Sequence, residues 1–194
     1  MDSMPKGSDP YNREDEVIAD LKLAQDILVL GVGNLLRQDE GVGVRVIKEL
    51  VANYYLPETV TVVDGGTAGF RLLPLLMDAR RLIIVDALDV GAPPGTVIEC
   101  TPEDLESPVL SASLHEAGPM ELLVELEAAT GQSIPTVIVG VQPANLSPWN
   151  DTLSEPVAAA VSEAVARVIT VLSRCGVVVV RRCAMLEVPR SSVG

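Results

Sequence analysis

Apolar residues in this chain gather in short runs that alternate with longer stretches of helical spacing. The run Ile27–Leu30 is apolar throughout, as expected of a strand buried on both faces of a sheet. Gly31 and Gly33 follow, where the chain can turn sharply. The segment VRVIKELV, which begins at Val44, then places its apolar residues on one face of a helix. This stretch predicts a strand, a glycine-rich loop and a helix.

The same alternation continues towards the C-terminus. Short apolar runs predict further strands at 60–63, 82–85, 96–100 and 136–141. Helical spacing predicts helices at 16–25, 70–77, 119–129 and 155–174. Pro74 should delay or distort the start of the helix at 70–77, and Gly176 is well placed to end the helix at 155–174. Residues 101–114 are expected to form a loop, and the end of the chain either an edge strand or a loose segment.

Strands that alternate with helices indicate an α/β fold with a mainly parallel sheet. We expect a single domain at 26–176, in which a twisted sheet of about five strands lies between helices. Residues 1–25 are polar and predict a partly disordered lead-in, and residues 177–194 form a C-terminal tail.

Composition narrows the classes of function. Hydrophobic residues make up 48% of the 194 residues and aromatic residues only 3%, so the core must be mainly aliphatic. The mean hydropathy is +0.34, but we find no run of 18 strongly apolar residues and no secretory signal pattern, and therefore expect no membrane insertion. A net charge of −13 argues against binding to nucleic acid or to anionic membranes.

Three cysteines, Cys100, Cys175 and Cys183, are scattered without a C-x-x-C pair. This number and spacing indicate neither a disulfide framework nor a zinc or iron–sulfur site. Cys100 could be a nucleophile, but nothing in the sequence marks it as activated. We expect a monomeric protein in a reducing, cytoplasmic setting.

The glycine-rich loop has two competing interpretations. A dinucleotide fingerprint requires G-x-G-x-x-G, whereas Leu36 occupies the third glycine position and Asp64 comes about ten residues too late. The alternative is that the loop presents Glu40 or Asp39 to a metal or a substrate. Both could equally be surface carboxylates that are stabilised near a helix N-terminus.

Carboxylates lie at or just beyond the ends of three predicted strands, at Glu40, Asp64 and Asp86. The only histidine, His115, lies in a loop before a helix. In a doubly wound sheet these loops meet at one edge, and two carboxylates with one imidazole would form an open site for a divalent transition metal. Each residue also has an ordinary role, because Asp commonly caps turns and a lone histidine is commonly a surface residue. The sequence contains neither a G-x-S-x-G elbow nor an H-E-x-x-H motif.

Five segments occur in order between Ile27 and Cys175: LVLGVGNLLRQDEGVGVRV, VVDGGTAGFRLL, LIIVDALDVGAPPGT, SLHEAG and IVGVQP. Together they resemble the [NiFe]-hydrogenase maturation endopeptidases. The resemblance implies an enzyme that removes a C-terminal extension from the hydrogenase large-subunit precursor, with the nickel already inserted into the precursor as the recognition signal. It also implies that Glu40, Asp86 and His115 contact this nickel, and that Asp64 belongs to the family pattern.

The chemical step is less defined than the site. We expect the three nickel-contacting residues to align the scissile peptide, while Asp39, Asp64 and Glu40 all remain candidates for activating water. The pair His115–Glu116 departs from the His-Gln pair of many relatives, and specificity among hydrogenases is expected in this loop and in 101–110. Two alternatives stay open, a non-cleaving metal-sensing chaperone and a Rossmann-like nucleotide-binding oxidoreductase.

Overall fold

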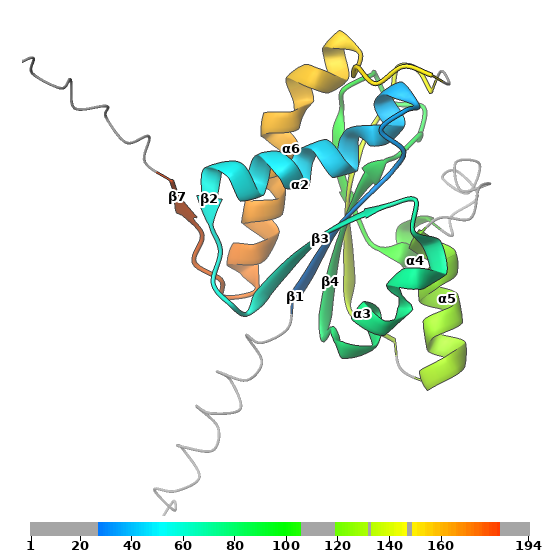
Figure 1. Ribbon diagram of the computed structural model, residues 1–194, viewed down its shortest axis with the longest axis vertical. Coiled ribbons are helices and arrows are strands. Elements are labelled where there is room, and N and C mark those ends of the chain that lie inside the picture. The colour runs from blue at the N-terminus through cyan, green and yellow to red at the C-terminus, as the bar shows by residue number, and fades with distance from the viewer. Residues whose placement is uncertain (1–26, 106–118, 132, 147–148, 183–194) are drawn as a thin grey trace, which may run out of the picture.

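A computed structural model describes residues 27–105, 119–131, 133–146 and 149–182 (Figure 1). Its central sheet contains five strands in the order β3-β1-β4-β6-β5. These strands are β1 (Ile27–Val32), β3 (Val60–Gly66), β4 (Arg81–Ala87), β5 (Val97–Cys100) and β6 (Thr136–Val141). All neighbours are parallel except β5, which runs antiparallel to β6 at one edge. The predicted α/β fold with a mostly parallel five-stranded sheet is therefore confirmed.

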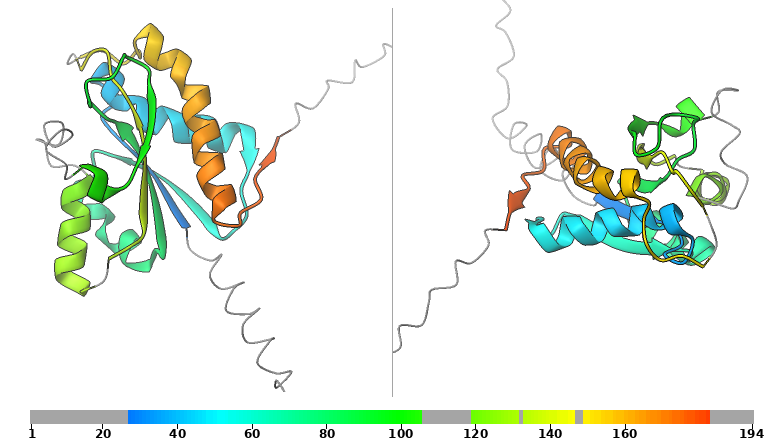
Figure 2. Two further views of the ribbon diagram at one scale, coloured as in Figure 1. Left: turned by 180° about the vertical axis from the view of Figure 1, so that it is seen from behind. Right: turned by 90° about the horizontal axis from the view of Figure 1, so that it is seen from above.

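Helices cover both faces of this sheet (Figure 2). One face carries α2 (Val42–Asn53) and α6 (Glu155–Arg174), which pack side by side. The other face carries α3 (Leu73–Asp78), α4 (Pro102–Leu105) and α5 (Pro119–Thr130). Two short 3-10 turns, η1 (Gln38–Gly41) and η2 (Gly69–Leu72), lead into α2 and α3.

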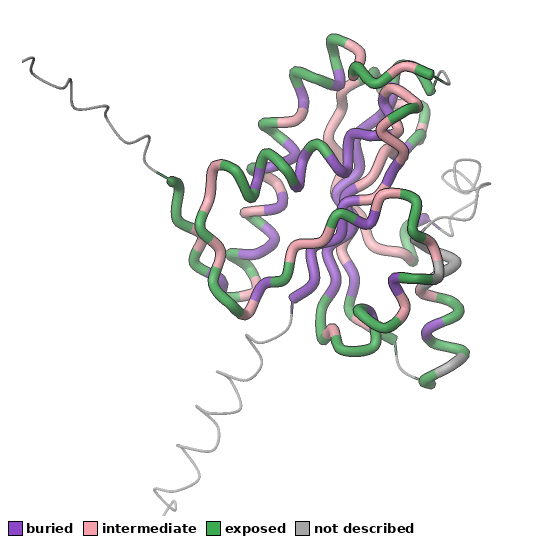
Figure 3. The backbone as a smooth tube through the Cα atoms, in the orientation of Figure 1, coloured by how far each residue is buried: buried purple, intermediate pink, exposed green. Residues whose placement is uncertain are grey.

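Alternate residues of β1 point into two separate aliphatic cores. Ile27 and Val29 join the core under α2 and α6, whereas Leu28 and Leu30 join the core under α3 and α5. All four side chains are at most 4% exposed, which explains why the run is apolar throughout rather than alternating. The burial map shows the strands as the buried centre of the molecule (Figure 3).

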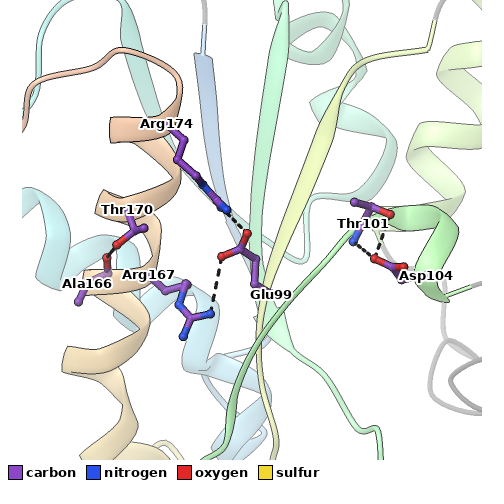
Figure 4. Close-up of polar contacts among 7 residues, drawn as sticks. All are labelled: Glu99, Thr101, Asp104, Ala166, Arg167, Thr170 and Arg174. Atoms are coloured by element: carbon purple, nitrogen blue, oxygen red, sulfur yellow. Dashed lines mark hydrogen bonds and ion pairs between the residues drawn. The ribbon is translucent and has the colours of Figure 1, made fainter.

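Helix α6 has the bounds expected from the sequence. Its length and composition alone would allow it to cross a membrane. However, its apolar side, which includes Val157, Ala164 and Leu172, is buried in the core with α2 and the sheet, as in a core helix of a globular protein. At the β5 edge of the sheet, Glu99 forms ion pairs with Arg167 and Arg174 of α6 (Figure 4).

Some local predictions were wrong or incomplete. Strand β3 continues through Asp64 to Gly66, and part of the expected loop at 101–114 forms helix α4. The segment after Gly176 adds a strand, β7 (Val180–Arg181), but this strand pairs with β2 (Tyr54–Tyr55) rather than with the main sheet. Pro74 lies in the first turn of α3, which begins late as expected. The expected helix at 16–25 lies outside the described residues.

Candidate active site

The glycine-rich loop brings Glu40 to the carboxyl end of the parallel strands. Gly33 has a φ of +127°, and a Cβ there would lie 1.7 Å from the carbonyl oxygen of Glu40. A Cβ on Gly43 would lie 2.1 Å from the carbonyl oxygen of Val85, at the end of β4. Glycines are therefore required because the backbone of the loop and of α2 packs directly onto its neighbours.

Asp39 is a structural carboxylate. Its side chain is fully buried, and Oδ1 accepts a hydrogen bond from the Ser154 amide at 2.7 Å. Oδ2 accepts from the amides of Ala144 and Asn145, both at 2.9 Å, and from Ser154 Oγ at 2.8 Å. These bonds join η1 to the connection between β6 and α6. Because both oxygens already accept hydrogen bonds, Asp39 is a poor candidate for activating water, although the sequence had suggested it.

Glu40, the next residue, has a different environment. Its Oε2 lies 2.8 Å from Nη1 of Arg37, and both side chains are half-buried. Residues of η1 also pack against β4, which ends at Asp86 and Ala87. The loop thus places a glutamate beside the end of the central strand.

Asp86 is half-buried at the end of β4. Its Oδ1 accepts a hydrogen bond from the Ala87 amide at 2.8 Å. Burial raises the pKa of Asp86 to about 7, the Ala87 amide opposes this rise, and the negative charge of Glu40 adds to it. With η1 packed against β4, Glu40 and Asp86, two of the predicted site residues, therefore lie close enough for their charges to interact.

The other two predicted site residues are not brought into this pair by any described contact. Asp64 is exposed on β3, and its Oδ2 lies 3.2 Å from Nζ of Lys48 in α2. His115 lies outside the described residues. Within the part of the chain that the structure describes, no three His, Cys, Asp or Glu side chains are gathered for a metal ion. If Glu40 and Asp86 bind a metal ion, a third protein ligand would lie outside the described residues, as His115 does.

Comparison with known proteins identifies the family. A protein-family model described as hydrogenase maturation protease (HycI) matches residues 44–171. The hydrogenase 2 maturation protease of Escherichia coli is 37% identical over 155 residues, which cover 78% of this chain and 93% of that protein. The hydrogenase expression/formation protein HupD of Bradyrhizobium diazoefficiens is 36% identical over 153 residues, covering 78% and 80%. The solved structure of the maturating endopeptidase HybD from E. coli has a TM-score of 0.70 at 36% identity and covers 81% of this chain and 98% of its own.

The chain belongs to the hydrogenase maturation protease family. It is accordingly an endopeptidase, a hydrolase of peptide bonds, and the resemblance seen in the five sequence segments is confirmed. Family membership sets aside both alternatives, the nucleotide-binding oxidoreductase and the non-cleaving chaperone.

The sequence places Gln142 at the end of a predicted strand, but only the structure shows what its side chain does. Gln142 directly follows β6 and is 5% exposed. Its Oε1 accepts hydrogen bonds from the amides of Val90 at 2.9 Å and Ala92 at 3.1 Å, and its Nε2 donates to Asp89 Oδ1 at 2.9 Å. Gln142 therefore holds the loop that follows Asp86. The signal was a lone amide at the end of an otherwise apolar strand.

A pocket of about 430 Å³ lies at the other end of the sheet. Its lining includes the starts of β4 and β6, at Arg81 and Thr136, together with Thr101, Leu123 and Cys175. Of the predicted site residues that the structure describes, neither Glu40 nor Asp64 nor Asp86 lines it. The edge that carries Glu40 and Asp86 is therefore separate from this pocket.

The raised pKa of Asp86 predicts a pH-dependent stability change in Asp86→Asn. Because the folded pKa of about 7 exceeds the ordinary value of 3.8, the wild-type endopeptidase loses stability as pH rises from 3.8 to about 7, and the loss is complete above pH 7. Asn carries no charge, so the variant should gain up to about 4 kcal/mol relative to wild type at pH 8 and much less at pH 5.

Urea unfolding of both proteins at the two pH values measures this difference. Asp64→Asn is the control, because Asp64 is exposed and ion-paired and should shift stability by less than about 1 kcal/mol at either pH. An Asp86→Asn difference that is the same at pH 5 and pH 8 would contradict the burial of a charge at this position.

Proposed function

We propose that this endopeptidase removes the C-terminal extension of a [NiFe]-hydrogenase large-subunit precursor after nickel insertion. The nickel belongs to the substrate, and Glu40, Asp86 and His115 would bind it as the recognition signal. The observation that carries the proposal is the pair of half-buried carboxylates at the carboxyl end of β1 and β4, where η1 packs against β4. Burial, and to a smaller extent the charge of Glu40, raises the pKa of Asp86.

Two neighbouring carboxylates favour a divalent cation at this position. When both are ionised they repel each other, and burial makes the charge on Asp86 costly. A cation offsets both terms, and carboxylate with imidazole is a donor set that nickel accepts. The sequence supplies one imidazole, on His115.

Binding of nickel through these residues would align the precursor's scissile peptide. Alignment of this kind can lower a barrier by about 7 kcal/mol when the geometry is good. Polarisation of the peptide carbonyl by a metal can lower it further. For the activation of water, Glu40 and Asp64 remain candidates, and Asp39 is withdrawn because four donors already occupy its oxygens.

We propose that the reaction takes place in the cytoplasm. The unpaired thiols of Cys100 and Cys175 are compatible with the reducing cytoplasm. We propose a monomer that acts on one precursor at a time.

A gel-shift assay tests the proposed function directly. Nickel-loaded and nickel-free precursors of one large subunit are incubated with the endopeptidase at equal concentrations. A faster-migrating product is expected only from the nickel-loaded precursor, with mass spectrometry locating the cut at the C-terminal extension. Equal cleavage of both precursors would contradict recognition through nickel, and absence of cleavage in a panel of cognate candidates would contradict the proposed substrate.

A further inference from the structure

The loop between β6 and α6 exposes the chain's only tryptophan. Trp149 is 87% exposed and has a φ of +64°. A left-handed backbone is rare for a bulky side chain and is disfavoured unless the surroundings enforce it. Within the described residues the indole gains little burial in return. An exposed aromatic side chain on a strained backbone is a feature that folding alone does not explain.

Backbone pairing fixes Trp149 next to the loop that presents Glu40. Its neighbour Asn150 forms a parallel bridge with Arg37. The Asn150 amide donates to the Leu36 carbonyl at 3.0 Å, and the Gln38 amide donates to the Asn150 carbonyl at 2.7 Å.

This pairing also brings a second apolar side chain to the same place. Leu36, on the paired segment, is 55% exposed. Gln38, on the other side of the bridge, is also left-handed, with a φ of +51°. We call Trp149 and Leu36 together the Trp149–Leu36 patch. It lies on the segment that leads directly into η1 and Glu40.

We infer that the Trp149–Leu36 patch is the docking surface for an apolar segment of the precursor beside its scissile peptide. This inference rests on the proposed function and assigns it a specificity-determining surface. Tryptophan buried at an interface contributes strongly to binding, and contact with the precursor would recover the burial that Trp149 lacks in the free chain. The continuity of the patch with the Glu40 loop favours the substrate as its occupant. A second copy of this chain is disfavoured because each copy carries a net charge of −13.

Kinetics of Trp149→Gly provide the first test. Glycine accepts a positive φ, so this variant removes the indole without straining the fold. We expect KM for the nickel-loaded precursor to rise at least about tenfold, kcat to change less than about twofold, and the melting temperature to stay equal or rise. Val178→Ala is the control, because Val178 is 78% exposed and lies beyond α6, away from the loop. Trp149→Phe should restore part of the affinity.

A single fluorine label gives a second readout that does not require cleavage. With 5-fluorotryptophan the chain has one ¹⁹F resonance, because it contains one tryptophan. Addition of unlabelled nickel-loaded precursor should shift this resonance and remove its dependence on H₂O versus D₂O.

The outcomes separate the docking surface from the proposed function. An unchanged KM in Trp149→Gly alongside efficient cleavage by wild type would overturn the patch and leave the proposed function standing. A shifted resonance without any cleavage would support the patch and contradict the proposed function. A resonance that depends on the concentration of the chain alone would assign the patch to self-association and overturn the inference.

Discussion

Glu40→Gln is expected to lower the rate of precursor processing by at least about a thousandfold, equivalent to about 4 kcal/mol of transition-state stabilisation. Gln keeps the shape of Glu but loses the negative charge that attracts a divalent cation and pairs with Arg37. Stability should change by less than about 1 kcal/mol, because a partly exposed ion pair contributes little. The variant would therefore separate the chemistry of the site from its folding.

Single-turnover processing of nickel-loaded precursor measures the rate, and thermal unfolding measures stability. Glu99→Gln is a matched control, since Glu99 is also a partly buried glutamate that pairs with arginines, at the β5 edge (Figure 4). It should process the precursor at the wild-type rate. Processing by Glu40→Gln at that same rate would remove Glu40 from the site, and a large loss of melting temperature would assign it a structural role.

Asp39→Asn is expected to destabilise the endopeptidase by about 4 kcal/mol and to abolish processing. Three of the four donors share Oδ2, and the fourth bonds Oδ1. In Asn one of these oxygens becomes an NH₂ group, which cannot accept a hydrogen bond. Whichever way the amide turns, at least one buried donor loses its partner and faces another donor. The connection at 144–154 would then no longer hold η1 in place.

Urea unfolding gives the stability change for this variant, and the gel-shift assay gives the activity. The control is Asp151→Asn, an exposed carboxylate in the same connection, which should remain within about 0.5 kcal/mol of wild type. Ser154→Ala removes one of the four donors, the Ser154 hydroxyl, and should lower the free energy of unfolding by about 1 kcal/mol. Near-wild-type stability of Asp39→Asn would refute the anchoring role and return Asp39 to the candidates for activating water.

The secondary structure was predictable where local patterns were strong. Strand β6 and helix α6 have the predicted bounds, because one is a continuous apolar run and the other a long stretch of helical spacing. The short elements β2 and β7 were not predictable in the same way. Each has two residues, and they exist because Tyr54 and Arg181, far apart in the chain, pair with each other.

The sequence by itself determined the α/β fold, the family and the placement of carboxylates at the ends of strands, because each depends on local pattern or on the order of recognisable segments. Only the tertiary structure distinguished Asp39 from Glu40, which are adjacent acidic residues in one glycine-rich loop. Asp39 is structural because its donors lie 105 to 115 residues further along the chain. Glu40 lies beside Asp86, near the end of β4, because β4 lies next to β1 in the sheet. Such contacts form only when the chain folds, so no local pattern could reveal them.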